Sequence, residues 1–295
     1  MPIAAVTREL LVRYLDSWTP AALQSAKRAT FAQAWSGEPD VDTAEAALRV
    51  FAEFADRLRG RRLAMVLLAP TVDGLTARLD AVQKELDTPA ALAVHIVAGP
   101  PDLLATAVKA AGAAGAPLLC QVDTDGPVPL AGVAAGRPGE LLLATQAGGW
   151  VEHRQALRDN GFPLTTGVEL VARGSARLVA FATASAKHLE AFKDALWAVD
   201  EYAGVRYRDP TDPGRHAMDI SLNPNPGPLR RELLAHLVSA GERTVTELRH
   251  FALTETIFRA SDAVRAVTAL VSAGSVIRTP EKGRLSGDVL VRAKA

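Results

Sequence analysis

The chain has 295 residues, of which 48% are hydrophobic and 22% are charged, and this ordinary globular composition excludes a disordered or fibrous protein. Its 33 Lys and Arg residues equal its 33 Asp and Glu residues, so the overall charge favours neither nucleic acid nor an anionic membrane. The single cysteine, Cys120, excludes a disulfide scaffold and a cysteine-based metal cage. No apolar stretch approaches the ~20 residues of a membrane span and the N-terminal residues do not resemble a signal peptide, so we expect a cytoplasmic protein without a membrane partner.

The first 200 residues alternate between helical and strand-like patterns. Helical spacing of apolar residues predicts helices over 7–18 (with Pro20 just beyond), 43–58, 74–86, 102–114 and 188–199. Apolar runs predict strands over 28–35, 63–69, 91–97, 118–122 and 140–144, and an antiparallel hairpin over 168–172 and 177–183. This order predicts an α/β fold: a Rossmann-like parallel sheet covered by helices, ending in a hairpin, of nucleotide-binding or methyltransferase type.

Charge and composition both change near residue 210. Residues 226–295 hold 11 Lys and Arg against 7 Asp and Glu, a balance of +4, so the rest of the chain carries −4. The stretch 206–228 contains five prolines, which prevent a continuous helix or a central strand. We therefore expect an α/β domain over 1–208, a Pro/Gly-rich linker over 209–225 and a second domain over 226–295.

The second domain carries the clearest local pattern in the chain. Thr244 and Glu247 have the spacing of a capping box at the start of a helix, and Ser261 is placed to cap the next one. Apolar spacing predicts three helices, over 228–240, 244 to about 252, and 261–273. Two short strands follow, over 276–278 and 289–292, joined by a basic turn. Three short helices followed by a basic hairpin predict a winged helix-turn-helix.

A winged helix would present its third helix and its wing to DNA. Arginines in those places can form bidentate contacts with guanine edges or phosphates. The alternative is a winged helix that contacts protein, because acidic residues lie among the basic ones and +4 is modest for a nucleic-acid binder. The candidate nucleic-acid-binding residues are Arg259, Ser261, Arg265, Lys282 and Arg284.

Three phrases resemble the three-Cys-motif partner family. They are LLVRYLDSW at 10–18, LVAFAT at 178–183 and LEAFKDALWAVD at 189–200, the last containing the most specific segment, 193–197. The resemblance covers nearly the whole chain. It implies a class I SAM-dependent methyltransferase domain followed by a winged helix, and a partner protein of the radical-SAM type that bears three cysteines.

The chain departs from this family where SAM would bind. At the first strand, Gln33 replaces an acid and Pro39 replaces the last glycine of a tight turn, whereas Gly37 is retained. Proline fixes φ and removes a donor where glycine supplied freedom. The second strand lacks the acid that would bind the ribose, with Asp73 the nearest candidate, and the fourth strand retains an acid and a glycine. The resemblance thus places a vestigial cofactor pocket at Gly37, Asp73, Asp123 and Gly126.

Other chemistry finds little support in the residues. No phosphate loop, dinucleotide fingerprint or nucleophile elbow occurs, the six histidines lack metal-ligand spacing, and no catalytic residue is assigned. The leading hypothesis is a non-catalytic or weakly catalytic methyltransferase-fold accessory protein, associated with DNA or a partner enzyme and needing no cofactor. The alternatives are an active SAM-dependent methyltransferase and a winged-helix transcription regulator.

Overall fold

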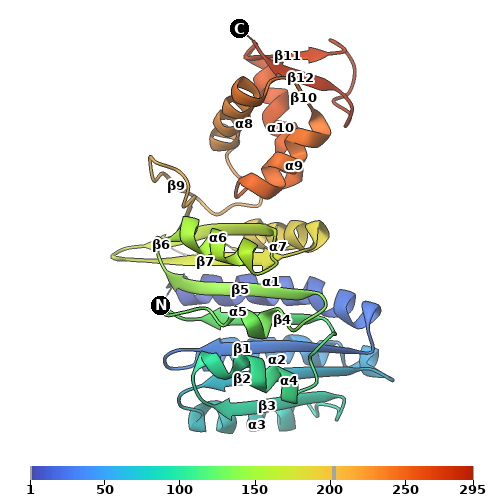
Figure 1. Cartoon of the computed structure of the whole chain (residues 1–295), viewed down its shortest axis with the longest axis vertical. Coiled ribbons are helices and arrows are strands. Elements are labelled where there is room, and N and C mark those ends of the chain that lie inside the picture. Colours follow the sequence, from blue (N-terminus) through green and yellow to red (C-terminus); the bar gives the residue numbers. More distant parts are fainter. Residues whose placement is uncertain (1, 201–203, 295) are drawn as a thin grey trace.

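The computed structural model describes residues 2–200 and 204–294. Across these residues the chain forms a nine-stranded sheet in the order β3-β2-β1-β4-β5-β7-β6-β8-β9 and a three-stranded sheet in the order β10-β12-β11 (Figure 1). The first five strands pair in parallel, and β7 runs antiparallel between β5 and β6. The predicted α/β sheet with its closing hairpin is confirmed, and its order is consistent with a Rossmann-like methyltransferase fold.

Apolar strands form the parallel half of the large sheet. These strands are β1 (Arg28–Trp35), β2 (Arg62–Ala69), β3 (Leu92–Ala98), β4 (Leu118–Asp123) and β5 (Gly139–Gln146). The antiparallel half contains β6 (Leu164–Ala172), β7 (Ser175–Thr183), β8 (Arg206–Arg208) and β9 (Ala217–Met218). Strands buried on both faces require near-continuous apolar sequence, which is why β1, β2, β4 and β5 could be found by that signal, whereas the edge strand β3 is only partly buried.

Helices cover both faces of the sheet. One face carries α1 (Pro2–Ser25), α2 (Val41–Glu53), α3 (Asp73–Glu85) and α7 (Ala186–Ala198), which share one apolar core with the strands. The other face carries the shorter helices α4 (Leu104–Ala110), α5 (Leu130–Val133) and α6 (Trp150–Asp159), which form a second core. None of the helices described is long and apolar enough to cross a membrane.

Three predicted helices have different ends in the structure, and the last of them, predicted over 102–114, shortens to α4 after the 3-10 turn Pro101–Leu103. The first continues through Pro20 to Ser25, because Ala22 and Leu23 beyond the proline are buried in the core. That burial offsets the ~3 kcal/mol that an interior proline costs a helix. The helix predicted over 43–58 ends at Glu53, and its last residues form the separate 3-10 turn Ala55–Leu58.

The C-terminal unit contains the predicted three helices and hairpin. Thr244 and Glu247 form the predicted capping box, in which the Thr244 hydroxyl accepts from the Glu247 amide at 3.1 Å. The prediction that Ser261 caps the next helix is wrong, because the helix begins at Ala260 and its N-cap residue is Arg259. The Asp262 carboxylate accepts a hydrogen bond from the Arg259 amide at 3.2 Å. The elements are α8 (Gly227–Ala240), β10 (Arg243–Thr244), α9 (Val245–Glu255), α10 (Ala260–Ser272), β11 (Val276–Thr279) and β12 (Leu290–Ala293).

The proline-rich segment 209–225 lies partly against the large sheet. Its strand β9 pairs with β8, which in turn pairs with β6. Buried Glu169 on β6 accepts hydrogen bonds from Arg208 at 3.1 Å and from Arg215 at 3.2 Å. The segment therefore extends the edge of the sheet before the chain enters α8.

A buried lysine joins α7 to the C-terminal unit. The Lys193 ammonium donates to the backbone carbonyls at the end of α9 and just beyond it, those of Ala252 (3.1 Å), Leu253 (2.6 Å), Thr256 (2.6 Å) and Phe258 (2.9 Å). The Trp197 indole donates to the Ile257 carbonyl at 3.0 Å, and its ring stacks on Phe258. Burial lowers the pKa of Lys193 to about 7, whereas the four carbonyl acceptors favour the charged form. The segment 193–197, the most specific part of the family resemblance, thus serves this junction.

Candidate functional site

The predicted cofactor residues gather at the carboxyl ends of the parallel strands. Strand order reverses between β1 and β4, and ligands of open α/β sheets bind in the crevice outside such a switch point. Trp35 at the end of β1 is the register partner of Asp123 at the end of β4, and the Ser36 amide donates to the Asp123 carbonyl at 3.0 Å. The loops that hold Gly37 and Gly126 therefore start side by side.

Neither predicted glycine is required by crowding within the chain. A Cβ built on Gly37 meets nothing within 4 Å, and one on Gly126 meets only the Thr124 hydroxyl, at 3.6 Å. The loop after β1 is short because Asp40 caps α2, where its carboxylate accepts from the Thr43 amide at 3.0 Å. The space above both glycines is thus open toward the crevice.

An arginine from β7 binds the acids that follow β4. Arg177 contacts the Asp123 carboxylate at 2.5 Å and the Asp125 carboxylate at 3.2 Å. Desolvation raises the pKa of Asp123, and the Arg177 guanidinium opposes that rise. Sequence reasoning missed Arg177, since it lies 54 residues from Asp123 and only the antiparallel insertion of β7 brings it there.

Strand β2 itself contains no acid that could bind a ribose. The strand ends at Ala69, the side chain of Thr71 donates to Glu38 at 3.0 Å, and the predicted acid, Asp73, is exposed in the first turn of α3. A ribose bound by a carboxylate gains charge-assisted hydrogen bonds, so this strand end fits SAM poorly. Asp123 and Asp125 at the end of β4 also fit SAM poorly, because both carboxylates already form ion pairs with Arg177.

Gln33, which replaces the family's acid, packs into the middle of the sheet. Its amide donates to the Gln121 side chain on β4 at 2.6 Å, and both residues are buried. The side-chain oxygen Oε1 of Gln33 has no hydrogen-bond partner within the described part of the chain. The pair fixes the register of β1 against β4 and does not reach the crevice as a ligand would.

The predicted nucleic-acid residues separate into two groups. Arg259 is nearly buried and binds Asp262 (2.9 Å) and the Leu222 carbonyl (2.8 Å), and Arg265 binds Asp262 (2.8 Å) and the Pro224 carbonyl (3.2 Å). These two arginines thus fasten α10 to the chain before α8. Arg265 is nevertheless exposed, as are Ser261 at the start of α10 and both Lys282 and Arg284 in the loop between β11 and β12.

A groove lies between α10 and that loop, and we call it the α10 groove. It has a volume of about 580 Å³, and no carboxylate lines it. Arg278 shapes its rim, because its guanidinium donates to the carbonyls of Pro280 (2.9 Å) and Gly283 (2.8 Å). The polar side chains that line the groove come from Arg249, Thr268, Arg278, Arg284 and Ser286. Sequence reasoning missed Arg249 and Arg278 as groove residues; the one available signal was that Arg249 lies on the polar face of the second helix.

A buried acid at the amino end of β5 organises another polar cluster. Glu140 accepts from the Tyr14 hydroxyl at 3.0 Å and the Thr183 hydroxyl at 2.8 Å, and it lies 2.5 Å from Nδ1 of His188. The hydrogen bond to Glu140 raises the pKa of His188, and burial raises the pKa of Tyr14. Both carboxylate oxygens of Glu140 have partners within the chain, and these contacts hold α1 and α7 against the sheet. Within residues 2–200 and 204–294, no group of three or more metal-ligating side chains could hold an ion.

Comparisons with known proteins bear on the fold alone. No family model matches the sequence, and no curated protein matches it. Among solved structures, the chain is similar to the MTase domain of METTL16, with a TM-score of 0.33 and 12% identity over 58% of this chain and 81% of that one. It is also similar to spermidine synthase from Thermotoga maritima, with a TM-score of 0.36 and 13% identity over 65% of this chain and 66% of that one. The fold assignment here rests on strand order and pairing, and no activity is transferred from such distant neighbours.

Proposed function

We propose that this chain is a methyltransferase-fold accessory protein, non-catalytic or weakly catalytic, that binds DNA through a C-terminal winged helix. The observation that carries the proposal is the α10 groove, where arginines from α9, β11 and the following loop meet without a lining carboxylate. In this proposal α10 is the recognition helix, and the loop between β11 and β12 is the wing.

The groove suits a phosphate backbone by its chemistry. Guanidinium groups offer paired donors that match phosphate oxygens, and hydroxyls such as that of Thr268 complete such contacts. Arg249 and Arg284 are exposed, so both can reach a ligand. In this proposal Arg284 contacts DNA, whereas Arg259 and Arg265, which donate to the carbonyls of Leu222 and Pro224, hold α10 in position.

The carboxyl ends of the sheet support the loss of methyl transfer. A cofactor pocket of this fold needs acids free to bind the ribose and the base, and Arg177 already pairs with the two acids after β4. Strand β2 itself contains none. In this proposal the sheet persists because it carries α7, whose Lys193 and Trp197 dock the C-terminal unit.

Fluorescence anisotropy with a labelled duplex, measured over a salt series, tests the DNA-binding claim. Removal of one arginine that binds a phosphate should lower the salt slope by about one, so Arg249→Ala combined with Arg284→Ala should lower it by about two and weaken binding. Arg292→Ala is the matched control, because this exposed arginine of the same unit does not line the groove. Absence of wild-type binding at low salt, or equal binding by the double variant, would overturn the claim.

An active SAM-dependent methyltransferase is the second candidate. The open space above Gly37 and Gly126 favours it, since backbone there could approach a ligand. In that case SAM would bring the methyl group, and Asp123 would face it only after leaving Arg177. Turnover of DNA or protein with radiolabelled SAM at ordinary enzymatic rates would establish this candidate over the accessory role.

The family resemblance further supports a protein partner of the radical-SAM type that bears three cysteines. Such a partner would bind the same C-terminal unit if that winged helix contacts protein instead of DNA. Co-elution of the two purified proteins on size exclusion, abolished in the double groove variant, is the expected result for that role.

A further inference from the structure

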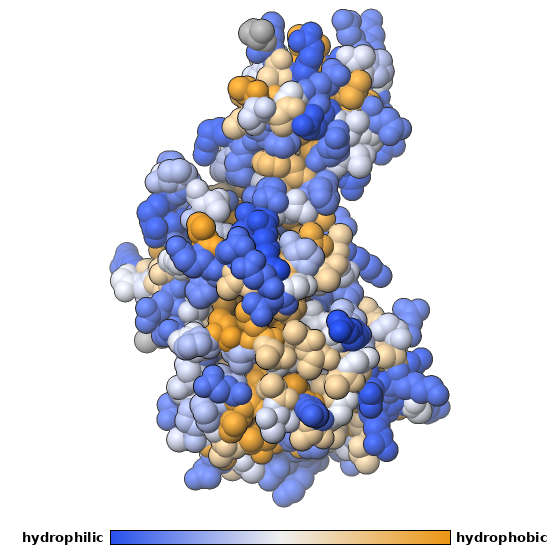
Figure 2. All heavy atoms as spheres, viewed as in Figure 1, coloured by the Kyte–Doolittle hydropathy of each residue, from blue (hydrophilic) through white to orange (hydrophobic). Residues whose placement is uncertain are grey.

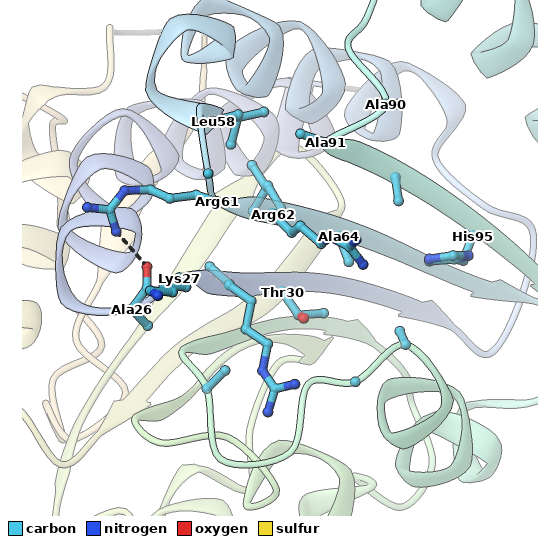
Figure 3. A pocket seen from close by; sticks show the side chains of 18 of the residues that line it. Ala26, Lys27, Thr30, Leu58, Arg61, Arg62, Ala64, Ala90, Ala91 and His95 are labelled. Atoms are coloured by element: carbon cyan, nitrogen blue, oxygen red, sulfur yellow. Dashed lines mark hydrogen bonds between the residues drawn. The ribbon is translucent and has the colours of Figure 1, made fainter.

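Besides the α10 groove, the protein has a second basic hollow, which lies at the amino ends of the parallel strands of the large sheet. It opens at the amino ends of β1, β2 and β3 and has a volume of about 1170 Å³. Figure 3 shows Lys27 in the loop between α1 and β1, Arg61 just before β2, Arg62 at its first position, and His95 on β3 around the hollow. The predicted cofactor residues follow the carboxyl ends of the same strands, so this hollow is a different site.

The hollow exists because the covering helix is short. Helix α4 has only seven residues, and its buried side chains, Leu104 and Val108, pack on the carboxyl half of the sheet face. On the amino half, Ala64 and Ala93 are register neighbours and remain only half-buried. Alanines and glycines supply most of the remaining lining, and apolar side chains gather on the face that carries α4 and α5 (Figure 2). The floor is therefore shallow and uncharged.

The rim carries four cations and no acid. Lys27, Arg28, Arg61 and Arg62 all line the hollow, and no Asp or Glu does. Among the residues that the structure describes, none of the four forms an ion pair with a carboxylate. The cluster is thus positive and uncompensated by side chains.

Backbone carbonyls position two of these arginines. Arg61 donates to the carbonyls of Leu23 and Ala26 at the end of α1, the latter at 2.9 Å, and Arg28 donates to the Ala114 carbonyl at 3.2 Å. The carboxyl end of α1 carries about half a negative charge, which Arg61 offsets. Lys27, Arg28 and Arg62 leave a net positive rim whose exposed side chains are ready for an anion.

We infer that this hollow binds a small polyphosphate, either inorganic or borne by a nucleoside. Arginine forks match phosphate oxygens bidentately, and several phosphates in a chain would satisfy cations spread around one rim. The volume exceeds the roughly 300–1,000 Å³ typical of small-molecule sites, so a nucleoside can lie on the alanine floor beside its phosphates. The lining comes from the loop between α1 and β1, the starts of β1, β2 and β3, and the segment after α4, and this concave shape favours a compact ligand over a nucleic-acid duplex, which needs an extended track.

Titration calorimetry in magnesium-free buffer with ATP, AMP and inorganic tripolyphosphate tests the inference. ATP or tripolyphosphate should bind, AMP should bind more weakly, and Lys27→Ala combined with Arg62→Ala should weaken binding at least tenfold. Both side chains are exposed and make no described hydrogen bond, so the variant should keep the wild-type melting temperature. Lys84→Ala, which removes an exposed lysine on α3 outside the hollow, is the control and should bind as wild type does.

The outcomes separate the sources of the phosphate. Tighter binding of ATP than of tripolyphosphate identifies a nucleotide, whereas equal binding identifies the phosphate chain alone, and both support the site. No heat with any of the three probes, or equal binding by the double variant, overturns it. Failure of ATP and tripolyphosphate together with variant-sensitive binding of a single-stranded oligonucleotide also overturns it, in favour of a nucleic-acid track. The variant with Arg249 and Arg284 replaced should bind polyphosphate normally, which keeps this test separate from the proposed DNA binding.

Discussion

Replacement of Lys193 by methionine removes an ammonium but keeps an unbranched apolar stem of similar length. The wild-type lysine is fully buried and donates to four carbonyls around the end of α9. One of these acceptors, the Ala252 carbonyl, also receives the Thr256 hydroxyl at 2.7 Å and so keeps a partner. The other three lose this donor, at about 1 kcal/mol or more each.

The expected loss in the free energy of unfolding is therefore about 3 kcal/mol. Removal of the buried ammonium also removes its desolvation cost, which reduces this loss. At about 2 °C per kcal/mol for a chain of this size, the melting temperature should fall by roughly 5 °C. The hydrogen bonds that Lys193 donates all join α7 to the C-terminal unit, so the variant should also unfold in two steps, with the C-terminal unit released first.

Urea unfolding followed by tryptophan fluorescence suits this prediction, because Trp197 stacks on Phe258 at the same junction. Lys187→Met is the matched control on α7; this lysine is exposed, so its removal should change stability by less than ~0.5 kcal/mol. If Lys193→Met unfolds at the wild-type urea concentration in one step, the junction is not held by this ammonium and the reasoning fails.

Further predictions concern titration and the centre of the sheet. Desolvation raises the pKa of Glu232 to about 7, so its carboxyl favours the fold below pH 4.5 and loses that contribution as pH rises through 7. Glu232→Gln should therefore raise the free energy of unfolding by about 1–3 kcal/mol over wild type at pH 8 and change it little at pH 4.5, as measured by thermal unfolding. An equal increase at both pH values would contradict the raised pKa. Arg177→Met should raise the pKa of Asp123 further, seen by carboxyl NMR titration, and an unchanged pKa would show that the ion pair does not form. Gln33→Ala and Gln121→Ala should each destabilise by about 1–3 kcal/mol but less than additively together, and additive losses in urea unfolding would exclude the buried hydrogen bond.

The parallel sheet could be predicted because its signal is local. The strand predicted over 28–35 coincides with β1, since every residue after Arg28 is buried and apolar sequence alone marks such a strand. The capping box at Thr244 is equally local and appears as predicted. Helix α6, by contrast, was missed because only Trp150 and Leu157 are buried in it, too few apolar positions to show a helical period.

The candidate sites depend on contacts that no local pattern encodes. Arg177 meets Asp123 only because β7 inserts between β5 and β6, and Arg259 lies against Leu222 only through the path of the chain before α8. The spacing of the sequence reveals the basic residues of the C-terminal unit. It does not reveal which of them form hydrogen bonds or ion pairs with carbonyls and acids of the same chain. The basic hollow likewise results from the short α4, whose predicted span of 102–114 shrinks to seven helical residues and leaves Ala64 uncovered.

The central proposal is that this methyltransferase-like fold acts without SAM, and calorimetric titration with SAM and S-adenosylhomocysteine tests it most directly. The ion pairs of Arg177 and the lack of an acid within β2 predict no detectable heat at millimolar ligand and no change in melting temperature. Binding of either compound at micromolar affinity, weakened by Asp123→Ala, would contradict the claim and make the active methyltransferase the better proposal.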